Sequence, residues 1–362
     1  MLPYYIAYGS MLIAAIVFCL NKNDADRSSE RRYCIFFGCL WTLLLGLRHP
    51  SMGVDLVYGG TEGYLGRFLY IDSMPLKPLL QYGVNNYEPG YIVFCKLLGI
   101  FTDDYQVLLF VCAALCIGLI TAWIYHNSEY PFFSTVIYLG LPCFLMNYSG
   151  LRQALAIAIS VWAFEMIKKK NKAGFLALVI LASLFHKTAV IFLIAYPVYH
   201  IKMRKNSGVL AMLSIPIVFV FREPLFRILS QIFKDDAQMD NNGAITLLLV
   251  FSLVYLVSAL LGHEDDQEEV GARNLFLIAC LCQAFGGIYS TAMRVGYYFM
   301  IYLVILLPRL VANVYTRARG FNNRRIALLM YLGILACFGL FGLYSIERGS
   351  WAMSAPYSFF WQ

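Results

Sequence analysis

Long apolar stretches recur along the whole chain. Most are about 15–22 residues long, which is the length that an α-helix needs to cross the hydrocarbon core of a bilayer. The pattern predicts membrane-spanning helices near residues 2–20, 33–47, 105–125, 131–147, 151–167, 207–221, 244–262, 272–292, 295–315 and 326–344. Residues 2–20 lack the basic start and small-residue cleavage site of a signal peptide, so we interpret them as the first span.

Basic residues between these stretches predict which ends face the cytoplasm. Four basic clusters stand out, at residues 21–32, 168–172, 200–206 and 317–325. Basic loops stay on the cytoplasmic side of a membrane. If all four clusters are cytoplasmic, the chain crosses an even number of times between successive clusters, and both ends of the sequence lie outside.

Two stretches are ambiguous, and the crossing count decides how we interpret them. Residues 88–101 number about 14 and include Glu88 and Lys96, so we expect a re-entrant or interfacial helix on the outer side. Residues 173–200 fit a tight hairpin with His186 and Lys187 near its outer turn. The alternative is one long tilted helix with His186 at mid-depth.

Composition agrees with a multi-pass membrane protein. Of 362 residues, 60% are hydrophobic and only 14% are charged, whereas soluble domains carry about 25% charged residues. We therefore predict an all-α transmembrane bundle of about 10–12 spans. It forms a single integral membrane domain over 1–362, with outer loops near 48–104 and 222–243.

Charge and cysteine content exclude several function classes. The net charge of +7 reports topology, and no basic cluster is interleaved with aromatic residues in a soluble domain, so we predict no nucleic-acid partner. Most of the ten cysteines lie inside apolar runs, so neither a metal site nor a disulfide framework is expected. Because no phosphate-binding loop, zinc motif or dinucleotide fingerprint is present, we predict no cofactor.

Ionisable residues gather on the predicted outer side, where topology favours few basic ones. Arg48 ends the second span, Arg152 opens the fifth, and Arg294 falls between two later spans. His186 joins them at the hairpin turn, and the outer segment adds two carboxylates, Asp55 and Glu88.

Each of these residues has a structural interpretation as well. Arg48 and Arg294 would extend to lipid phosphates, and Arg152 would pair with a buried acid such as Asp55. Glu88 would open a helix ahead of Pro89.

The residue types point to an anionic, lipid-linked ligand. Arginine binds phosphate with two parallel donors and keeps its charge. A pyrophosphate at headgroup depth suits this group, and the carboxylates and histidine suit sugar hydroxyls and proton transfer.

The chain also resembles the EpsG branch of Wzy-type polysaccharide polymerases. The matching motifs follow the family's order and cover most of the chain: "RHPSMGVDLVY" (48–58), "NNYEPGYIVF" (85–94), "NYSGLRQALAIAI" (147–159), "SLFHKTAVIF" (183–192), "MRVGYYF" (293–299) and "PYSFFW" (356–361). The family often has Gly-Thr-Asp where this chain has Gly53-Val54-Asp55.

The resemblance implies a GT-C/Wzy-like helical enzyme in the bacterial cytoplasmic membrane, with its site at the outer face. Such polymerases join repeat units carried on undecaprenyl pyrophosphate, without ATP or nucleotide sugars. Membrane lipid, a flippase and a chain-length regulator of the same pathway are the implied partners. Whether the polymer is capsule, exopolysaccharide or O-antigen stays open.

We assign roles to the candidate residues by chemistry. Arg152, Arg294 and Arg48 would stabilise the leaving pyrophosphate. His186, Glu88 or Asp55 would accept the proton of the attacking hydroxyl. Within the matched motifs, Gln153, Asn147 and Tyr297 would contact sugar.

Three other function classes are weighed. A flippase or transporter would carry charges through the depth of the bundle rather than at one face. A ligase of the O-antigen type would use the same arginine and histidine chemistry with another acceptor. A membrane O-acyltransferase would need a catalytic histidine but not several outer arginines.

Overall fold

Helices make up all of the regular elements in the computed structural model. The structure describes residues 1–19, 27–57, 63–84, 87–233, 245–316, 321–348 and 352–362. The prediction of an all-helical membrane bundle is therefore confirmed. The chain divides into two compact units, unit 1 with residues 1–190 and 334–362, and unit 2 with residues 191–333. The single membrane domain over 1–362 stays a prediction.

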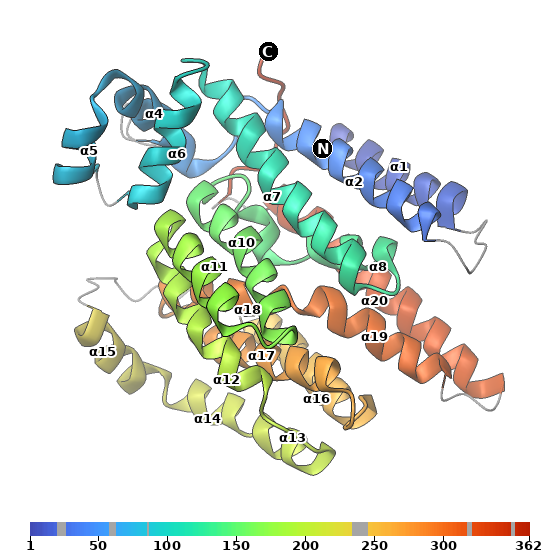
Figure 1. Cartoon of the computed structure of the whole chain (residues 1–362). Helices are drawn as coiled ribbons and strands as arrows, with labels where there is room; N and C mark the ends of the chain where they lie inside the picture. The colour runs from blue at the N-terminus through green and yellow to red at the C-terminus, as the bar shows by residue number, and fades with distance from the viewer. Residues whose placement is uncertain (20–26, 58–62, 85–86, 234–244, 317–320, 349–351) are drawn as a thin grey trace. The chain divides into compact units, whose positions relative to one another are not determined.

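Unit 1 contains the predicted outer segment and the helices that hold it. In Figure 1, α2 lies beside both α1 and α7, and α10 packs on α7 and on α11. The outer segment folds into four short helices, in which α6 contacts α4, α5 and α11. The helices are α1 (Leu2–Cys19), α2 (Ser28–Gly46), α3 (Val54–Val57), α4 (Tyr64–Ser73), α5 (Leu76–Tyr82), α6 (Pro89–Gly99), α7 (Tyr105–Asn127), α8 (Pro131–Leu139), α9 (Pro142–Leu145), α10 (Leu151–Lys168) and α11 (Lys172–Phe185).

Unit 2 is arranged around α17, which contacts α12, α14, α16, α18 and α19. A 3₁₀ helix, η2 (Lys187–Ile194), leads from unit 1 into unit 2, and α20 (Phe321–Arg348) begins in unit 2 and ends in unit 1. The other helices are α12 (Ala195–Tyr199), α13 (Lys205–Met212), α14 (Ser214–Val220), α15 (Arg222–Phe233), α16 (Ile245–Leu261), α17 (Gln267–Gln283), α18 (Ser290–Met300) and α19 (Leu303–Thr316).

Few helices are long enough to cross a membrane alone. Among the described residues, Tyr105–Asn127 and Arg324–Arg348 meet this criterion, and two bent helix pairs would raise the number to four. Apolar helices such as α1, α11 and α16 are shorter; 17 residues reach only about 26 Å. The predicted total of about 10–12 spans stays a prediction.

Three predicted spans have different boundaries from those expected. Residues 131–147 break into α8 and α9, because Pro142 supplies no N–H and disfavours helix at Leu141. The span expected at 272–292 is α17, which begins at Gln267 because Asp266 caps it through the N–H groups of Glu268 and Glu269. The span expected at 295–315 is split into α18 and α19, bent by 44°.

The two ambiguous stretches are resolved in the described structure. Residues 173–200 are not one long helix, since α11 ends at Phe185 and His186 has extended backbone (φ −154°, ψ 117°). The break falls where the hairpin turn was predicted. Residues 88–101 form the short helix α6, with Pro89 in its first turn. In the second predicted outer loop, 222–233 form α15 and 234–243 lie outside the described residues.

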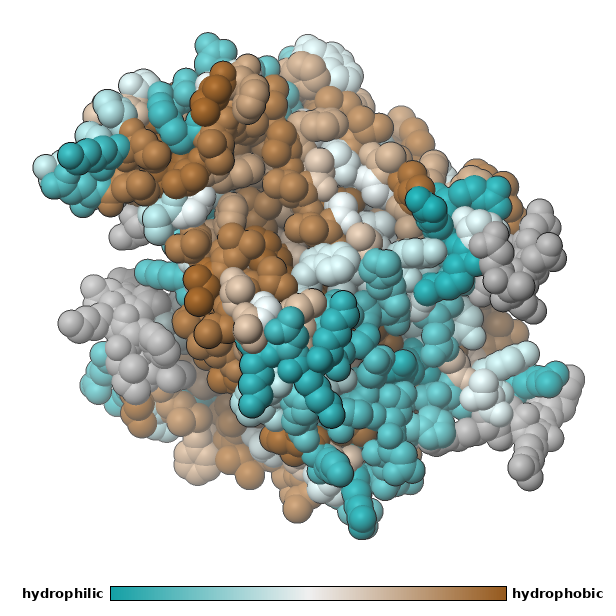
Figure 2. Space-filling model, in the orientation of Figure 1, coloured by the Kyte–Doolittle hydropathy of each residue, from teal (hydrophilic) through white to brown (hydrophobic). Residues whose placement is uncertain are grey.

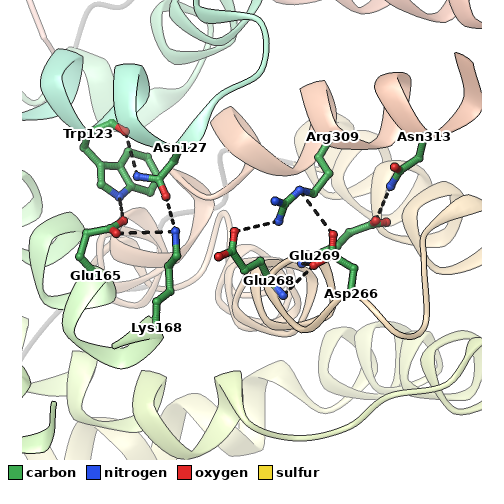
Figure 3. A network of polar contacts seen from close by, with 9 residues as sticks. All are labelled: Trp123, Asn127, Glu165, Lys168, Asp266, Glu268, Glu269, Arg309 and Asn313. Atoms are coloured by element: carbon green, nitrogen blue, oxygen red, sulfur yellow. Dashed lines mark hydrogen bonds and ion pairs between the residues drawn. The ribbon is translucent and has the colours of Figure 1, made fainter. Parts of the chain in front are cut away.

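A polar network ties α7 to α10 near the predicted cytoplasmic side. The indole N–H of Trp123 donates to Glu165 (3.0 Å), and the ammonium group of Lys168 donates to Asn127 (2.7 Å), as Figure 3 shows. The Lys168 ammonium also lies 3.6 Å from Glu165. These charged groups satisfy one another, so we interpret them as structural.

A second network, within unit 2, surrounds the start of α17 (Figure 3). Arg309 on α19 contacts the carboxylates of Asp266 (3.5 Å) and Glu268 (3.1 Å). Asn313, one turn further along α19, donates to Glu269 at 2.5 Å. Through these contacts, the acidic run "HEDDQEE" (263–269) joins α17 to α19.

Residues 352–362 pair with the end of α2, and we call this segment the strap. The N–H of His49 donates to the carbonyl of Ser358 (2.8 Å), and the N–H of Phe360 donates to that of Leu47 (3.0 Å). An isolated antiparallel bridge therefore joins this part of the strap to Arg48.

The strap also reaches the loop before α10 and the start of α1. The hydroxyl of Ser149 donates to the carbonyl of Ala352 at 3.1 Å. Tyr4 donates from its hydroxyl to the carbonyl of Ser354 at 2.6 Å. One short segment thus holds three parts of unit 1 that are far apart in sequence.

The turn before α3 depends on a glycine. Gly53 has φ +126°, in the left-handed region that other residues rarely adopt. A Cβ atom there would lie 2.2 Å from the carbonyl oxygen of Tyr148. The same turn is held to this loop by the N–H of Val54, which donates to the Ser149 hydroxyl at 3.2 Å.

We expect Gly53→Ala to destabilise the protein by about 2 kcal/mol, through backbone strain and this clash. Gly9→Ala on α1 is the matched control, because nothing lies within 4 Å of an added Cβ there. Thermal unfolding in detergent would show a lower midpoint for Gly53→Ala only. Equal midpoints for the two variants would mean that the turn relaxes without cost.

Candidate functional site

Three elements of unit 1 bring Glu88, Arg152 and His186 into contact. Glu88 precedes the first turn of α6, Arg152 lies in the first turn of α10, and His186 follows the last residue of α11. We call these three residues, together with Tyr64 and Tyr87, the Glu88 cluster. Its three ionisable members are ones that the sequence predicted for the outer face.

Both carboxylate oxygens of Glu88 are used. Oε2 lies 2.5 Å from Nη1 of Arg152. Oε1 accepts the backbone N–H of Lys187 at 2.9 Å and lies 3.3 Å from Nδ1 of His186. Although Glu88 stands at the cap position of α6, its side chain makes no capping hydrogen bond there. The carboxylate is directed at α10 and the end of α11 instead.

These contacts lower the pKa of Glu88. Burial alone would raise it, but the nearby His186 ring, the hydrogen bond from the Lys187 N–H and the charge of Arg152 outweigh burial and lower the pKa from 4.5 to about 2. The carboxylate therefore stays ionised at neutral pH. A carboxylate with so low a pKa is a weak proton acceptor, so the arrangement favours an orienting role for Glu88 over the predicted role of base.

The shift also predicts how stability depends on pH. A depressed pKa stabilises the fold above the unfolded value of 4.5, and this stability is lost as the pH falls through about 2. The shift corresponds to about 3 kcal/mol. We expect the unfolding midpoint of Glu88→Gln to lie below that of the wild type by a constant amount between pH 5.5 and 8. The gap should narrow below pH 4.5, and a gap that is unchanged down to pH 3 would contradict this assignment.

Two tyrosines hold Arg152 on its other sides. Its Nε donates to the hydroxyl of Tyr64 at 3.2 Å, and its guanidinium lies 4.3 Å from the ring centre of Tyr87. The two rings stack with centres 5.6 Å apart. Arg152 is thus fixed by a carboxylate, a hydroxyl and an aromatic face, while 17% of its side chain remains exposed. The sequence offered the alternative that Arg152 pairs with a buried acid such as Asp55. In the structure, the acid in the ion pair with Arg152 is Glu88.

His186 is placed to exchange a proton with a ligand. Its Nδ1 faces Glu88, so the neutral ring with its proton on Nδ1 leaves Nε2 as an acceptor. One fifth of the side chain is exposed. A carboxylate that orients a histidine in this way is a recurrent device of proton-transfer sites.

Close packing of α6 on α11 positions Glu88 beside His186. A Cβ atom on Gly90 would lie 2.7 Å from both the Cβ and the carbonyl oxygen of Leu184. Only a residue without a side chain fits at this contact. Further along, the rings of Phe94 and Phe185 lie 6.0 Å apart and continue the interface.

Arg48 follows the end of α2, as the sequence predicted, but its side chain turns inward. The residue is fully buried, and its guanidinium donates to the carbonyls of Leu45, Met52 (3.2 Å), Asn147 (2.9 Å) and Tyr148 (3.2 Å). These bonds join the end of α2 to the loop before α10. These bonds indicate a structural role in holding that loop, and the pyrophosphate contact of Arg48 stays a prediction.

Two predicted sugar contacts are buried as well. Asn147 is 4% exposed, and its amide donates to the hydroxyl of Tyr138 (3.1 Å) and the carbonyl of Phe144 (2.7 Å). Gln153 is 3% exposed on the inner side of α10. Neither side chain is presented to a sugar at the surface of unit 1.

The remaining predicted residues lie outside the Glu88 cluster as defined. Asp55, half-buried on α3, neighbours it: burial raises the pKa of Tyr64, Arg152 lowers it, and Asp55 raises it further. Arg294 and Tyr297 belong to unit 2. Arg294 is exposed within α18 rather than between two spans, and Tyr297 is 5% exposed.

The sequence interpretation missed Arg67 and the two tyrosines. Arg67 lies one turn after Tyr64 on α4, and its charge acts on Tyr87: burial raises the pKa of that tyrosine, while Arg152 and Arg67 oppose the rise. Topology could have singled out Arg67, because few basic residues are expected in an outer segment. No comparable signal separates Tyr64 and Tyr87 from the other aromatic residues.

Comparison with known proteins gives one match. The model of the EpsG family matches residues 31–359, which is nearly the whole chain and includes every residue of the Glu88 cluster. No curated protein and no solved structure matches.

Proposed function

Because the chain belongs to the EpsG family of polysaccharide biosynthesis, we propose that it polymerises repeat units carried on a polyprenyl pyrophosphate. The reaction would take place at the outer face of the bacterial cytoplasmic membrane, where an undecaprenyl pyrophosphate carries the growing chain. The observation that carries the proposal is the contact of Arg152 and His186 with one carboxylate, Glu88.

The proposed reaction is a sugar transfer between two lipid-linked substrates. A hydroxyl of the incoming unit forms a bond to the anomeric carbon of the growing chain. The bond from that carbon to the pyrophosphate oxygen breaks, and the oxygen leaves with the electron pair. The hydroxyl proton passes to Nε2 of His186. No further energy source is required, because the donor bond is itself activated.

Each member of the Glu88 cluster has a part in this scheme. Arg152 would balance the charge that develops on the leaving pyrophosphate. Glu88 would hold Arg152 and the ring of His186 in place, which agrees with its low pKa. Tyr64 and Tyr87 would fix the orientation of the guanidinium, so that little reorganisation is needed during reaction.

An O-antigen-ligase-like transfer stays the closest alternative, since it uses the same donor chemistry with another acceptor. A flippase or transporter is the other alternative. The Glu88 cluster favours a transferase over both simple transport and structural pairing, because it holds an oriented histidine beside an arginine with part of its surface exposed.

The test is polymer size in a strain from which the gene is deleted. Complementation with the full chain should give a ladder of many repeats, whereas the deletion should give single repeats at the surface. Single repeats in both strains would reject the polymerase. Lipid-linked units that stay inside the deletion strain would favour the flippase.

A further inference from the structure

A stripe of exposed apolar side chains runs along α11 toward the Glu88 cluster. Leu176, Ile180 and Leu184 are 48%, 52% and 39% exposed. Residues four apart lie above one another on a helix, so the three side chains line one face. The sequence from 176 to 184 contains no charged residue.

Further exposed apolar side chains lie on and next to α6. Leu97 on α6 and Ile100 directly after it are 56% and 70% exposed, and α6 packs directly on α11. We call the five residues Leu97, Ile100, Leu176, Ile180 and Leu184 the α6–α11 face. In Figure 2, hydrophobic residues gather over these two helices on the side toward the viewer.

Both helices meet the Glu88 cluster at one end. Helix α6 begins directly after Glu88, and α11 ends directly before His186. Leu184 is therefore two residues from the proposed base, and the stripe extends about 12 Å from it to Leu176 along α11. The exposed apolar face of α1, which includes Ile13, lies on a helix that contributes no residue to the cluster.

We propose that the α6–α11 face binds the first isoprene units of the lipid-linked donor. The inference rests on the proposed function, because it takes the pyrophosphate to lie beside Arg152 and His186. The isoprenoid chain is bonded to that pyrophosphate, so its first units must occupy the nearest apolar surface. The branched, uncharged side chains of this face suit the methyl-branched isoprenoid chain. A bulk lipid has no headgroup fixed at the Glu88 cluster, so nothing would hold its chain at this position.

The kinetic test uses Ile180→Asn, with Ile13→Asn as its matched control. Both isoleucines are more than half exposed, on α11 and α1 of the same unit. In nanodiscs, KM is measured for a donor with a long polyprenyl chain and for one in which a single isoprene unit, too short to reach Ile180, replaces that chain. We expect the preference for the long chain to fall about tenfold in Ile180→Asn alone.

A milder variant protects this test from misfolding. Ile180→Ala keeps α11 apolar and should reduce the preference for the long chain in the same direction by a smaller factor. Because the result is the ratio of the KM values for the two donors, a loss of folded protein affects both measurements equally and cancels. Equal ratios in Ile180→Asn, Ile13→Asn and the wild type would overturn the proposal.

A binding experiment separates this inference from the proposed function. Polyprenyl pyrophosphates with a photoreactive group on one of their first four isoprene units are cross-linked to the full chain without acceptor. We expect adducts on α6 and α11 between Leu97 and Ile100 and between Leu176 and Leu184. If these adducts form in a protein that makes no polymer, the proposal that the α6–α11 face binds the isoprenoid chain stands and the proposed polymerase function is rejected. Adducts elsewhere in an active polymerase would reject the face.

Discussion

Arg152→Ala is expected to lower polymer formation by about 100-fold or more. The loss of one preorganised donor to a developing negative charge has this effect in other group-transfer enzymes. Arg152 is held by Glu88 at 2.5 Å and by Tyr64 at 3.2 Å, so its guanidinium is already oriented before a ligand binds. The measurement is the rate of repeat addition to a defined lipid-linked acceptor, with the amount of folded protein in the membrane matched.

Two further variants show whether charge or geometry matters at this position. Arg152→Lys keeps the charge but loses the paired donors and the flat contact with Tyr87, and it should recover little of the rate. Lys77→Ala removes an exposed cation from α5 in the same outer segment and should leave the rate unchanged. A full polymer ladder from Arg152→Ala would reduce Arg152 to a structural partner of Glu88.

His186→Ala is expected to reduce the rate by about 100-fold to 10,000-fold, the usual contribution of a general base. Binding of the lipid-linked donor should persist, because Arg152 and Glu88 remain paired with each other. A single-turnover experiment at saturating donor separates the two effects. The chemical step should slow, while the donor concentration needed for half-saturation changes little.

The neighbouring residue supplies a matched control for His186. Lys187 contributes its backbone N–H to Glu88, and its side chain is exposed. Lys187→Ala therefore keeps that hydrogen bond and should retain most of the rate. Added imidazole should restore part of the activity of His186→Ala if the ring accepts a proton. Equal rates in the two alanine variants would remove His186 from the mechanism.

Topology from the sequence placed Glu88, Arg152 and His186 on one side of the membrane without predicting their contact. Each is an ionisable residue at the edge of an apolar run on the predicted outer side, where few basic residues are expected. Their shared side and depth narrowed the choice of candidate site residues but gave no distance between them. The contact also needs Gly90, whose missing side chain lets α6 approach α11.

Arg48 shows what the same argument does not reveal. By position it resembles Arg152, since both lie at the outer end of an apolar run. Their difference is in the direction of the side chain: Arg48 turns inward to four backbone carbonyls, two of them close in sequence and two in the distant loop before α10. Hydropathy reports how deep a residue lies, not which way it points. Hydropathy likewise did not reveal that Asn147 and Gln153 are buried, and their sugar contacts stay predictions.

Helix boundaries were predictable where the signal is local. Pro142 separates α8 from α9, as its missing N–H and restricted backbone predict, although hydropathy merged the two helices into one span. The start of α17 was missed because its polar residues are paired after folding. Glu269 is fully buried and accepts from the Asn313 amide (2.5 Å) and the backbone N–H of His263 (3.1 Å). A window of hydropathy treats such a residue as exposed.

The strap imposes an order on assembly. During synthesis, the ribosome makes α1, α2 and the loop before α10 long before it reaches Ala352 and Ser358, which hold them in the finished protein. Until then, the turn at Gly53 and the mouth of α10 lack part of their support. A nascent chain can therefore have its first helices inserted while the loop before α10 still lacks these contacts. That loop, and with it the start of α10, would gain its full support only after translation has passed Ser358.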